Sequence, residues 1–512
     1  MTKHTVNIIG AGLAGLSSAL TLARKGVHVN LVSPMPSERA QSVMAEGGIN
    51  AAMNENDTTR EHYEDTLKGG AFIGEERSIE GLTNAAPSIV EELIKLGVPF
   101  NNENGKITLR FFGGQKKNRT AYSRSSTGKI VMSAMIEAVR KYEAEGLVTR
   151  FPHHVFELLD IGDNGCKGVI IRDLYSLKAF RLNGPVIIAT GGMNSLFPGL
   201  TTGTTVNTGD VTAYLYSIGV PLSNLEFIQY HPTTASIEGK RCLISEAARG
   251  EGGRLMILKG GNPWYFMEEK YPELGNLMPR DITAREIILN SEEGFAYLDM
   301  TALPSDTWEN KLSDMREEII SLLGTDPVKD YVKISPGIHY FMGGIYVNED
   351  HGTSMDGLYA AGECACRYHG ANRLGGNSML GAIYGGRIAA SNISYDEDLI
   401  SEVDQPYEYI NFHAPSAITE PLVSAVGIIR DGRTMQKSLD TLMNIDTVDF
   451  KTGDKRRLLL AQAILTCALS REESRGSHYR TDFPEKNDEK FKAKSVITYS
   501  GNKHNLSYEV DK

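Results

Sequence analysis

Four clusters in the sequence carry the histidine, arginine and glutamate side chains most able to do chemistry. They are Gln229–Thr234 (Gln-Tyr-His-Pro-Thr-Thr), Ser245–Gly253 (Ser-Glu-Ala-Ala-Arg-Gly-Glu-Gly-Gly), Pro279–Arg285, and the span Ile338–Ser378 with its His-Gly-Ala-Asn-Arg-Leu-Gly-Gly-Asn-Ser end. Arginine suits a carboxylate partner, because its planar guanidinium donates two parallel hydrogen bonds. A lone His-Pro pair is more often a capped turn, and a lone Arg-Asp pair is usually a weak surface ion pair. In combination, the clusters indicate one functional site rather than four unrelated loops.

The N-terminus predicts an element that could position a phosphate-bearing ligand beside these clusters. Gly10, Gly12 and Gly15 form a GxGxxG pattern between an apolar stretch at 5–9 and a helical stretch that runs to Lys25. A strand, a glycine turn and a helix in this order predict a dinucleotide-binding βαβ unit whose helix N-terminus faces the phosphates. The second strand ends in Ser33, where an aspartate or glutamate for the ribose is usual.

The rest of the chain divides by composition and periodicity. Amphipathic helices are expected within 55–145 and strands within 150–190, which ends in Val-Ile-Ile-Ala-Thr-Gly-Gly, a second glycine-tipped edge of the same sheet. The pattern changes at about residue 221. We therefore expect a first domain over 1–220, an inserted domain over 221–344, a return to the first domain over 345–403, a linker at Asp404–Pro415, and a helical domain with a polar tail over 416–512. The acidic stretch Asp396–Asp404 is expected to be a solvated linker.

Composition and charge exclude several function classes. The chain has 512 residues, 41% of them hydrophobic, and no stretch approaches the ~18 apolar residues of a membrane span. The first residues lack the pattern of a signal peptide. A net charge of −11 without a long basic block disfavours nucleic acid as a partner. Five cysteines without a CxxC pair predict a reducing, cytoplasmic setting, and exclude an iron–sulfur cluster held by this chain's cysteines alone.

Two further motifs complete the pattern: Ser42–Ala52 (Ser-Val-Met-Ala-Glu-Gly-Gly-Ile-Asn-Ala-Ala) and Thr208-Gly209-Asp210. Together and in this order, all the clusters resemble the flavoprotein subunit of fumarate reductase and succinate dehydrogenase, whose superfamily includes L-aspartate oxidase. The resemblance extends from about residue 5 to about 485 and includes Arg471–Pro484. It implies an α/β Rossmann-type FAD-binding domain, an inserted α+β capping domain above a C4-dicarboxylate, and a C-terminal helical domain.

The resemblance also implies roles for individual residues. The expected FAD contacts are Gly10, Gly12, Ala14, Gly15, Ser33, Ser42, Gly47, Gly48, Thr190, Gly191, Asp210, Glu363 and Ser378. The expected substrate contacts are His231, Ser245, His339, Arg373 and Phe112. Arg280 is the expected proton donor, and Glu246 and Arg249 would relay its replacement proton. Because arginine ordinarily keeps its proton above pH ~12, this role requires that closure of the capping domain exclude water.

One position departs from the family pattern. Many members attach FAD through the histidine of Arg-Ser-His-Thr-Val-Ala-Ala, but this chain has Arg39-Ala-Gln-Ser-Val-Met-Ala45, which places Gln41 there. Glutamine cannot form that bond, so the FAD is expected to be non-covalent. An imidazole bonded to the flavin raises its reduction potential. Its absence therefore favours reduction of fumarate to succinate, with hydride from flavin N5, over the reverse reaction.

Two alternative activities stay open: L-aspartate oxidation, because L-aspartate oxidase also holds FAD without a covalent bond, and reduction of another unsaturated carboxylate. The oxidase would need an acidic residue for the substrate ammonium near 110–120. That stretch is basic, Arg110-Phe-Phe-Gly-Gly-Gln-Lys-Lys-Asn-Arg119. A flavin disulfide reductase would need a CxxxxC pair, which is missing.

By resemblance, electrons come from an iron–sulfur subunit or a soluble donor, and such partners could hold the chain peripherally at the inner face of a membrane, without direct insertion.

Overall fold

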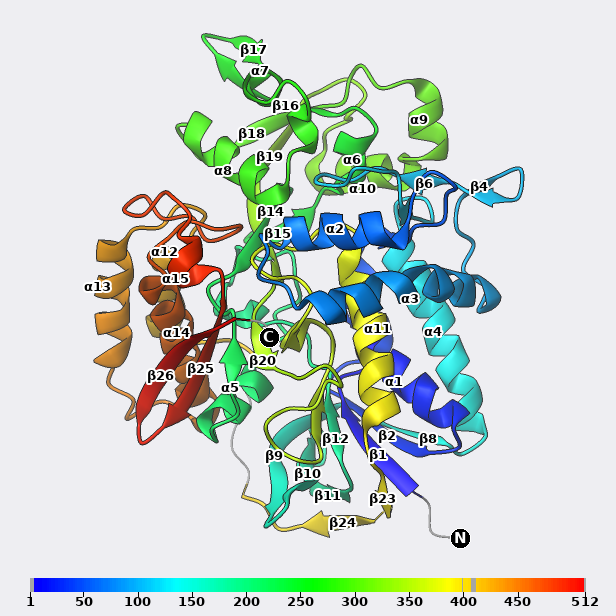
Figure 1. Ribbon diagram of the computed structural model, residues 1–512, viewed down its shortest axis with the longest axis vertical. Coiled ribbons are helices and arrows are strands. Elements are labelled where there is room, and N and C mark those ends of the chain that lie inside the picture. The colour runs from blue at the N-terminus through cyan, green and yellow to red at the C-terminus, as the bar shows by residue number, and fades with distance from the viewer. Residues whose placement is uncertain (1–3, 398, 407–410, 511–512) are drawn as a thin grey trace.

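A six-stranded, mainly parallel sheet forms the centre of the fold (Figure 1). The computed structural model describes residues 4–397, 399–406 and 411–510. The sheet has the order β21-β12-β1-β2-β8, with β23 on the side of β1. Its strands are β1 (His4–Ile9), β2 (His28–Ser33), β8 (Val148–Pro152), β12 (Val186–Ile188), β21 (Leu358–Ala360) and β23 (Asp396–Glu397). The two strands expected at 5–9 and 27–33 are therefore confirmed to within one residue.

Alternate residues of these strands enter two different cores, because side chains along a strand point to opposite faces. Val6 and Ile8 pack against the helices on one face, whereas Ile9 packs on the other face. The helices of the first face are α1 (Leu13–Arg24), α3 (Glu76–Lys95), α4 (Thr127–Ala144) and α11 (Asn377–Asn392), with α2 (Thr59–Gly69) beyond them. The small apolar residues of α1 leave almost its whole surface buried.

Glycine at two positions allows α1 and β12 to approach β1 closely. A Cβ atom on Gly15 would lie 1.9 Å from the Gly10 carbonyl oxygen. A Cβ atom on Gly10, where φ is +114°, would lie 2.1 Å from the Ala189 carbonyl oxygen. Both contacts are with backbone, which cannot rotate away as a side chain can. The GxGxxG spacing is thus required by packing as well as by any ligand.

The second face carries a four-stranded antiparallel sheet in the order β24-β11-β10-β9. Its strands are β9 (His154–Gly162), β10 (Gly165–Asp173), β11 (Ala179–Asn183) and β24 (Ile400–Val403). The expectation of a linker at 396–404 is wrong in part, since β23 and β24 are edge strands of two sheets. Their side chains are solvent-exposed, as expected, and charged residues are typical of an edge strand with one free side. The linker expected at Asp404–Pro415 includes residues 407–410, which lie outside the described residues.

A second antiparallel sheet, in the order β15-β14-β19-β18-β16-β17, lies at the top of Figure 1 and has its own hydrophobic core. Its strands are β14 (Ile228–Ile237), β15 (Lys240–Leu243), β16 (Arg254–Lys259), β17 (Asn262–Trp264), β18 (Ala296–Asp299) and β19 (Val332–Phe341). Its helices are α6 (Ala247–Gly250), α7 (Phe266–Lys270), α8 (Arg280–Asn290), α9 (Ser305–Asn310) and α10 (Ser313–Leu323). These elements lie within 221–344, the segment that we propose as the inserted domain.

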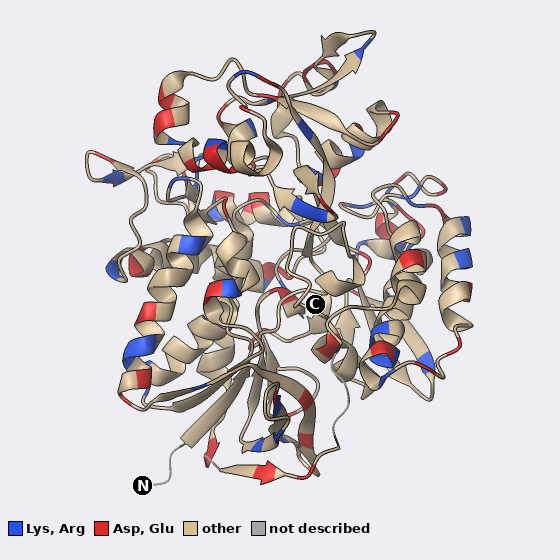
Figure 2. Ribbon diagram, turned by 180° about the vertical axis from the view of Figure 1, so that it is seen from behind, with Lys and Arg blue, Asp and Glu red and all other residues tan. Residues whose placement is uncertain are grey.

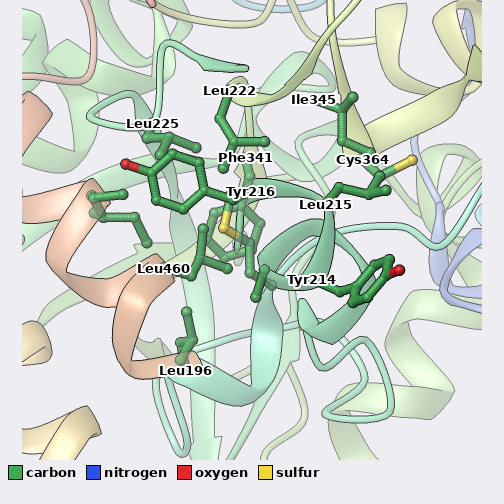
Figure 3. Packing of buried hydrophobic residues seen from close by; sticks show 14 of the residues in the cluster. Leu196, Tyr214, Leu215, Tyr216, Leu222, Leu225, Phe341, Ile345, Cys364 and Leu460 are labelled. Carbon is green, nitrogen blue, oxygen red and sulfur yellow. The ribbon is translucent and has the colours of Figure 1, made fainter. Parts of the chain in front are cut away.

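The C-terminal part packs against helix α5 (Asp210–Ser217) through helix α14 (Thr452–Ser470), and both helices contribute to the core on the second face of the central sheet (Figure 3). Leu460 of α14 contributes to one core with Tyr216 and Phe341, from elements far apart in sequence. Its helices are α12 (Ser416–Ala425), α13 (Gly432–Met443), α14 (Thr452–Ser470) and α15 (Asp488–Phe491). The polar tail forms a hairpin of β25 (Lys494–Ser500) and β26 (Lys503–Glu509). This hairpin is part of a five-stranded sheet in the order β22-β20-β13-β25-β26. The other strands of this sheet are β13 (Leu222–Ser223), β20 (Gly344–Tyr346) and β22 (Ala365–Cys366).

The remaining elements are short or lie at the edges of the units above. They are α5 (Asp210–Ser217), β3 (Ile49–Asn50), β4 (Asn102–Glu103), β5 (Lys106–Ile107), β6 (Leu109–Arg110) and β7 (Thr120–Ala121). Seen from behind, basic and acidic residues are interspersed along the elements (Figure 2). Within the described ranges, no helix combines the length and apolar character needed to cross a bilayer.

The glycine contacts generate a prediction about stability. Gly15→Ala forces backbone apart between β1 and α1, so we expect it to destabilise the fold by about 1–3 kcal/mol or more, seen as a lower Tm. Gly12→Ala is the matched control, because a Cβ atom there would meet nothing closer than the Ser42 hydroxyl at 3.5 Å. Equal melting temperatures for the two variants would contradict the packing role of Gly15.

Candidate active site

One cavity opens where the central strands end. Its lining follows directly after β1, β2, β12 and β21, at the carboxyl edge of the parallel sheet, where ligands of such folds bind. The predicted FAD contacts that line it are Gly10, Gly12, Ala14, Ser33, Ser42, Gly47, Gly48, Thr190, Gly191, Asp210, Glu363 and Ser378. The predicted substrate-side residues that line it are Phe112, His231, Ser245, Glu246, Arg280, His339 and Arg373. Two predicted residues, Gly15 and Arg249, lie behind this wall.

The loop geometry fits a dinucleotide such as FAD. Helix α1 begins at this cavity with no acidic residue in its first turn, and the Leu13 N–H donates to the Ser42 hydroxyl (3.2 Å). Such a helix N-terminus favours a phosphate. The hydroxyl of Ser33 donates to the Met35 carbonyl (2.7 Å), so it keeps only acceptor capacity for a ribose. The residues present therefore fit the cofactor that the sequence predicts.

Two acidic residues among the predicted FAD contacts have raised pKa values. Burial raises the pKa of Asp210 to about 6, although Arg457 of α14, with Nε 3.5 Å from it, favours the ionised form. Burial also raises the pKa of Glu363 to about 7, against the Phe341 N–H that donates to its carboxylate (3.1 Å). Both carboxylates therefore carry less negative charge near neutral pH than ordinary acids do.

A buried carboxylate joins the cationic residues of the inserted domain. Glu246 precedes α6, and its Oε2 accepts from Nε and Nη2 of Arg280 at 2.8 and 2.7 Å. Its Oε1 accepts from the Gly113 N–H (2.8 Å) and lies 3.6 Å from Arg249. Burial alone would raise the pKa of Glu246, but Arg280 and Arg249 outweigh burial and hold it below its usual range. Glu246 is thus an anion shared by two arginines.

Arg373 has no such partner. No carboxylate of the described residues lies within ion-pair distance of its guanidinium, and its buried Nε has no hydrogen-bond partner. Its Nη2 donates to Gln229 Oε1 (3.0 Å), and its guanidinium lies over the Tyr340 ring, 4.5 Å from the centroid. Burial, and then the nearby Arg280, lower the pKa of Arg373 to about 9. At neutral pH this leaves a buried cation that faces the cavity and has no ion-pair partner among the described residues, although Glu363 and Glu246 are close enough to favour its charged form.

Gln229 belongs to the candidate site, although the sequence analysis assigned it no role. Its Oε1 accepts from both Arg280 (3.2 Å) and Arg373 (3.0 Å), and its Nε2 donates to the Arg373 carbonyl (2.8 Å). It thereby holds two like-charged guanidiniums side by side. The available signal was its position two residues before His231 on one strand, where residues two apart share a face. Glu46 is another missed lining residue, and burial and Glu318 raise its pKa well above the ordinary value.

The rings of His231 and His339 lie together, with centroids 5.1 Å apart. Burial, followed by Arg280, lowers the pKa of each well below its usual value, so both are neutral at physiological pH. Nδ1 of His231 lies 3.1 Å from the Thr233 carbonyl, and Nδ1 of His339 lies 2.9 Å from the Thr202 hydroxyl. The described residues offer Nε2 of either ring no hydrogen-bond partner, which leaves both atoms available to a ligand.

Phe112 and Ser245 complete the wall. Phe112 is fully buried and lies against the glycine pair, since a Cβ atom on Gly47 would be 3.0 Å from its ring. The Ser245 hydroxyl lies just before α6, near the start of the Glu246 turn. Arginines, neutral histidines, a hydroxyl and one apolar ring surround a space with excess positive charge. This arrangement can hold a small dianion and exclude water from it.

The Glu246 cluster generates a prediction about pH-dependent stability. Glu246→Gln leaves two buried arginines without their anion, which we expect to cost about 3–5 kcal/mol at neutral pH. Because the folded-state pKa of Glu246 lies below the ordinary 4.5, its contribution is present above that pH and is lost as the pH falls through the folded value. The difference in Tm between the wild type and the variant should narrow on acidification to about pH 4. A constant difference would contradict this charge assignment.

Comparisons with known proteins agree with the geometry. The model of an FAD-binding domain matches residues 5–379, and that of the fumarate reductase flavoprotein C-terminal region matches 454–511. The chain is 37% identical to the succinate dehydrogenase flavoprotein subunit of Bacillus subtilis over 96% of its length and 93% of the relative's. It is 34% identical to the L-aspartate oxidase of Pyrococcus abyssi, over 94% and 97% of the two chains.

Among solved structures, an E. coli quinol fumarate reductase chain matches with a TM-score of 0.85 and 26% identity, over 100% of this chain and 98% of that chain. The expected fold class, an FAD-binding α/β domain with further units, is confirmed by these matches. The chain belongs to the family of succinate dehydrogenase and fumarate reductase flavoproteins, which are FAD-dependent oxidoreductases acting on CH–CH bonds and are related to L-aspartate oxidase.

Proposed function

We propose that the protein reduces fumarate to succinate. The observation that carries this proposal is the buried Arg373 guanidinium, which faces the cavity without a carboxylate partner among the residues described. A buried cation without a counter-ion is costly unless a ligand supplies one. Fumarate brings two carboxylates at a fixed separation, so one can pair with Arg373 and the other with the neutral His339 ring and Ser245.

The roles of the chain's residues follow from this placement. FAD, when bound in its reduced form, would supply the hydride for one alkene carbon. Arg280, held by Glu246 and Gln229, donates a proton to the other carbon, which completes succinate. Glu246 and Arg249 return a proton to Arg280, a step supported by the 2.7 Å contact of Glu246 with Arg280 and its 3.6 Å contact with Arg249. Phe112 and the inserted domain exclude water, which would otherwise stabilise the arginine cation.

L-aspartate oxidation is an alternative that the similarity to L-aspartate oxidases supports, and the charge distribution disfavours it. An amino-acid substrate needs an anion for its ammonium group. Glu246 is already shared by two arginines, and Glu46 lies near Glu318, where burial favours the neutral form of its side chain. The predicted basic loop also lacks a free acid: Arg110 lies 3.7 Å from Glu251, and Arg119 pairs with Asp57 and Asp65.

The cofactor and the electron supply belong to the same proposal. Gln41 lines the cavity where the family places its attachment histidine, so the FAD is held without a covalent bond. The described cysteines are all free, and no metal-binding group occurs among the described residues. By its similarity to flavoprotein subunits, the chain would receive electrons from a separate iron–sulfur subunit or a soluble donor, and it would be cytoplasmic or would attach to a membrane through such a partner.

The proton-transfer assignment predicts different outcomes for two arginines. Arg280→Lys should lower kcat by about 10²–10⁴-fold with FAD content and fumarate affinity nearly unchanged, because it removes the proton donor. Arg373→Lys should instead weaken fumarate binding by about 10–100-fold, because lysine cannot pair with the carboxylate at two points. Steady-state kinetics and fumarate titration of the oxidised protein measure both effects. Full turnover in Arg280→Lys would remove Arg280 from the mechanism.

The overall reaction is tested with the purified, FAD-loaded protein under anaerobic conditions. After chemical reduction, fumarate should reoxidise the flavin rapidly, whereas L-aspartate should not bleach the oxidised flavin. Bleaching by L-aspartate would assign an amino-acid oxidase instead. A lack of response to both would point to another unsaturated carboxylate. Acid precipitation should release all the FAD into the supernatant, and flavin retained on the protein would contradict non-covalent binding.

A further inference from the structure

The loop of residues 201–204 connects the two ends of the cavity. At one end the Thr204 N–H donates to the side-chain oxygen of Gln41 (2.6 Å), and both residues line the cavity. At the other end the Thr202 hydroxyl lies 2.9 Å from Nδ1 of His339. The Thr202 N–H also donates to the Ile338 carbonyl (2.9 Å), which anchors the loop to β19 next to that histidine.

The loop is fixed at further points, so its geometry is well defined. The Thr201 hydroxyl accepts from the Asn194 side chain (2.7 Å) and from the Gly203 N–H (2.9 Å). Thr201 also forms a parallel bridge with Ile338. Because the loop is held on both sides of Thr202, the Thr202 hydroxyl has one position. On the side of the predicted cofactor contacts, the loop is held by the hydrogen bond from Thr204 to Gln41.

The hydrogen atoms can be assigned from the distances. A threonine hydroxyl has one proton to donate. Two acceptors lie near that of Thr202: Nδ1 of His339 at 2.9 Å and the Ile338 carbonyl at 3.4 Å. The contact with Nδ1 is the shorter of the two and therefore the better hydrogen bond. The proton therefore goes to Nδ1, which must be the unprotonated nitrogen of the ring.

We propose that Thr202 sets the tautomer of His339 so that its single N–H, on Nε2, points into the cavity, and that Gln41 holds the loop that presents Thr202. This inference rests on the proposed function, in which His339 donates to a substrate carboxylate. A neutral histidine has one donor and one acceptor, so the opposite tautomer would turn a lone pair toward the anion. Thr202 and Gln41 are thus positioning residues that act through His339.

The tautomer can be measured directly. In protein with ¹⁵N-labelled histidine rings, the His339 signals are those lost in His339→Gln. In the wild type Nε2 should carry the proton, and Nδ1 should accept a hydrogen bond. In Thr202→Val the Nδ1 signal should move to that of a nitrogen without a hydrogen-bond donor, and Thr202→Ser should restore it. Thr204→Val is the matched control, because it keeps the N–H that bonds Gln41 and should leave the pattern unchanged. Protonated Nδ1 in the wild type would overturn the proposal.

Ligand binding provides the second readout, with fumarate titrated against the oxidised holoenzyme by the change in flavin absorbance. Thr202→Val should weaken binding by about five- to tenfold, the effect of one misplaced hydrogen bond to a charged group. Gln41→Met should also weaken fumarate binding. Gln41→Glu should weaken it much less, because glutamate keeps the oxygen that accepts from the Thr204 N–H. Combining Gln41→Met with Thr202→Val should add little, since both act on His339.

The outcomes separate this inference from the proposed function. If wild-type protein binds no fumarate but His339 shows the Thr202-dependent pattern, the tautomer assignment stands and fumarate reduction is wrong. If fumarate binds normally to Thr202→Val, the positioning role is wrong and fumarate reduction is unaffected. Wild-type His339 signals and affinity in Gln41→Met would remove Gln41 from the proposal.

Discussion

The structure depends on how it neutralises a group of buried arginines. Arg280, Arg249 and Arg373 lie within one water-poor region, and Glu246 is the ionised carboxylate that two of them share. Burying a charge without a partner costs several kcal/mol, so the protein holds each guanidinium with hydrogen bonds and leaves only Arg373 without an anion. Gln229 makes this possible, because its amide oxygen accepts from two cations without adding charge. In the proposed function, the remaining positive charge is what selects an anionic ligand.

The architecture brings this group together from separate units. Gln229 and His231 lie on β14, Glu246 lies before α6, Arg280 begins α8, and Arg373 comes from the loop before α11 on the central unit. The inserted domain therefore contributes most of the donors, while the parallel sheet provides the glycine-lined edge for the cofactor. Because Glu246 accepts from Arg280 and also from the Gly113 backbone N–H, the same carboxylate ties the segment 221–344, which we propose as the inserted domain, to the segment 1–220.

A second arginine network shows the contrast between structural and functional charge. Arg471 is fully buried, and its guanidinium donates to Glu226, to Glu473 and to the backbone carbonyls of Phe491 and Ala493. Arg475 pairs with Glu473 at 2.7 Å. Every one of these contacts is protein to protein, so the network stabilises the C-terminal part without capacity for a ligand. Arg373, equally buried, differs because part of its hydrogen-bonding capacity is unused.

The sequence by itself determined the local elements and most of the polar residues that line the cavity. The GxGxxG turn, the first two strands and the helix between them follow from short-range periodicity, and the clusters around His231, Glu246, Arg280, His339 and Arg373 do line one cavity. Only the tertiary structure decided which side chains pair: that Gln229 joins two arginines, that Arg249 lies behind Glu246, that the acidic stretch 396–404 forms edge strands, and that Thr202 faces His339. Periodicity indicates which face of a strand or helix a residue occupies. A contact with a residue hundreds of positions away depends instead on how separate units pack. The charge, tautomer and pKa of the buried side chains follow from that packing.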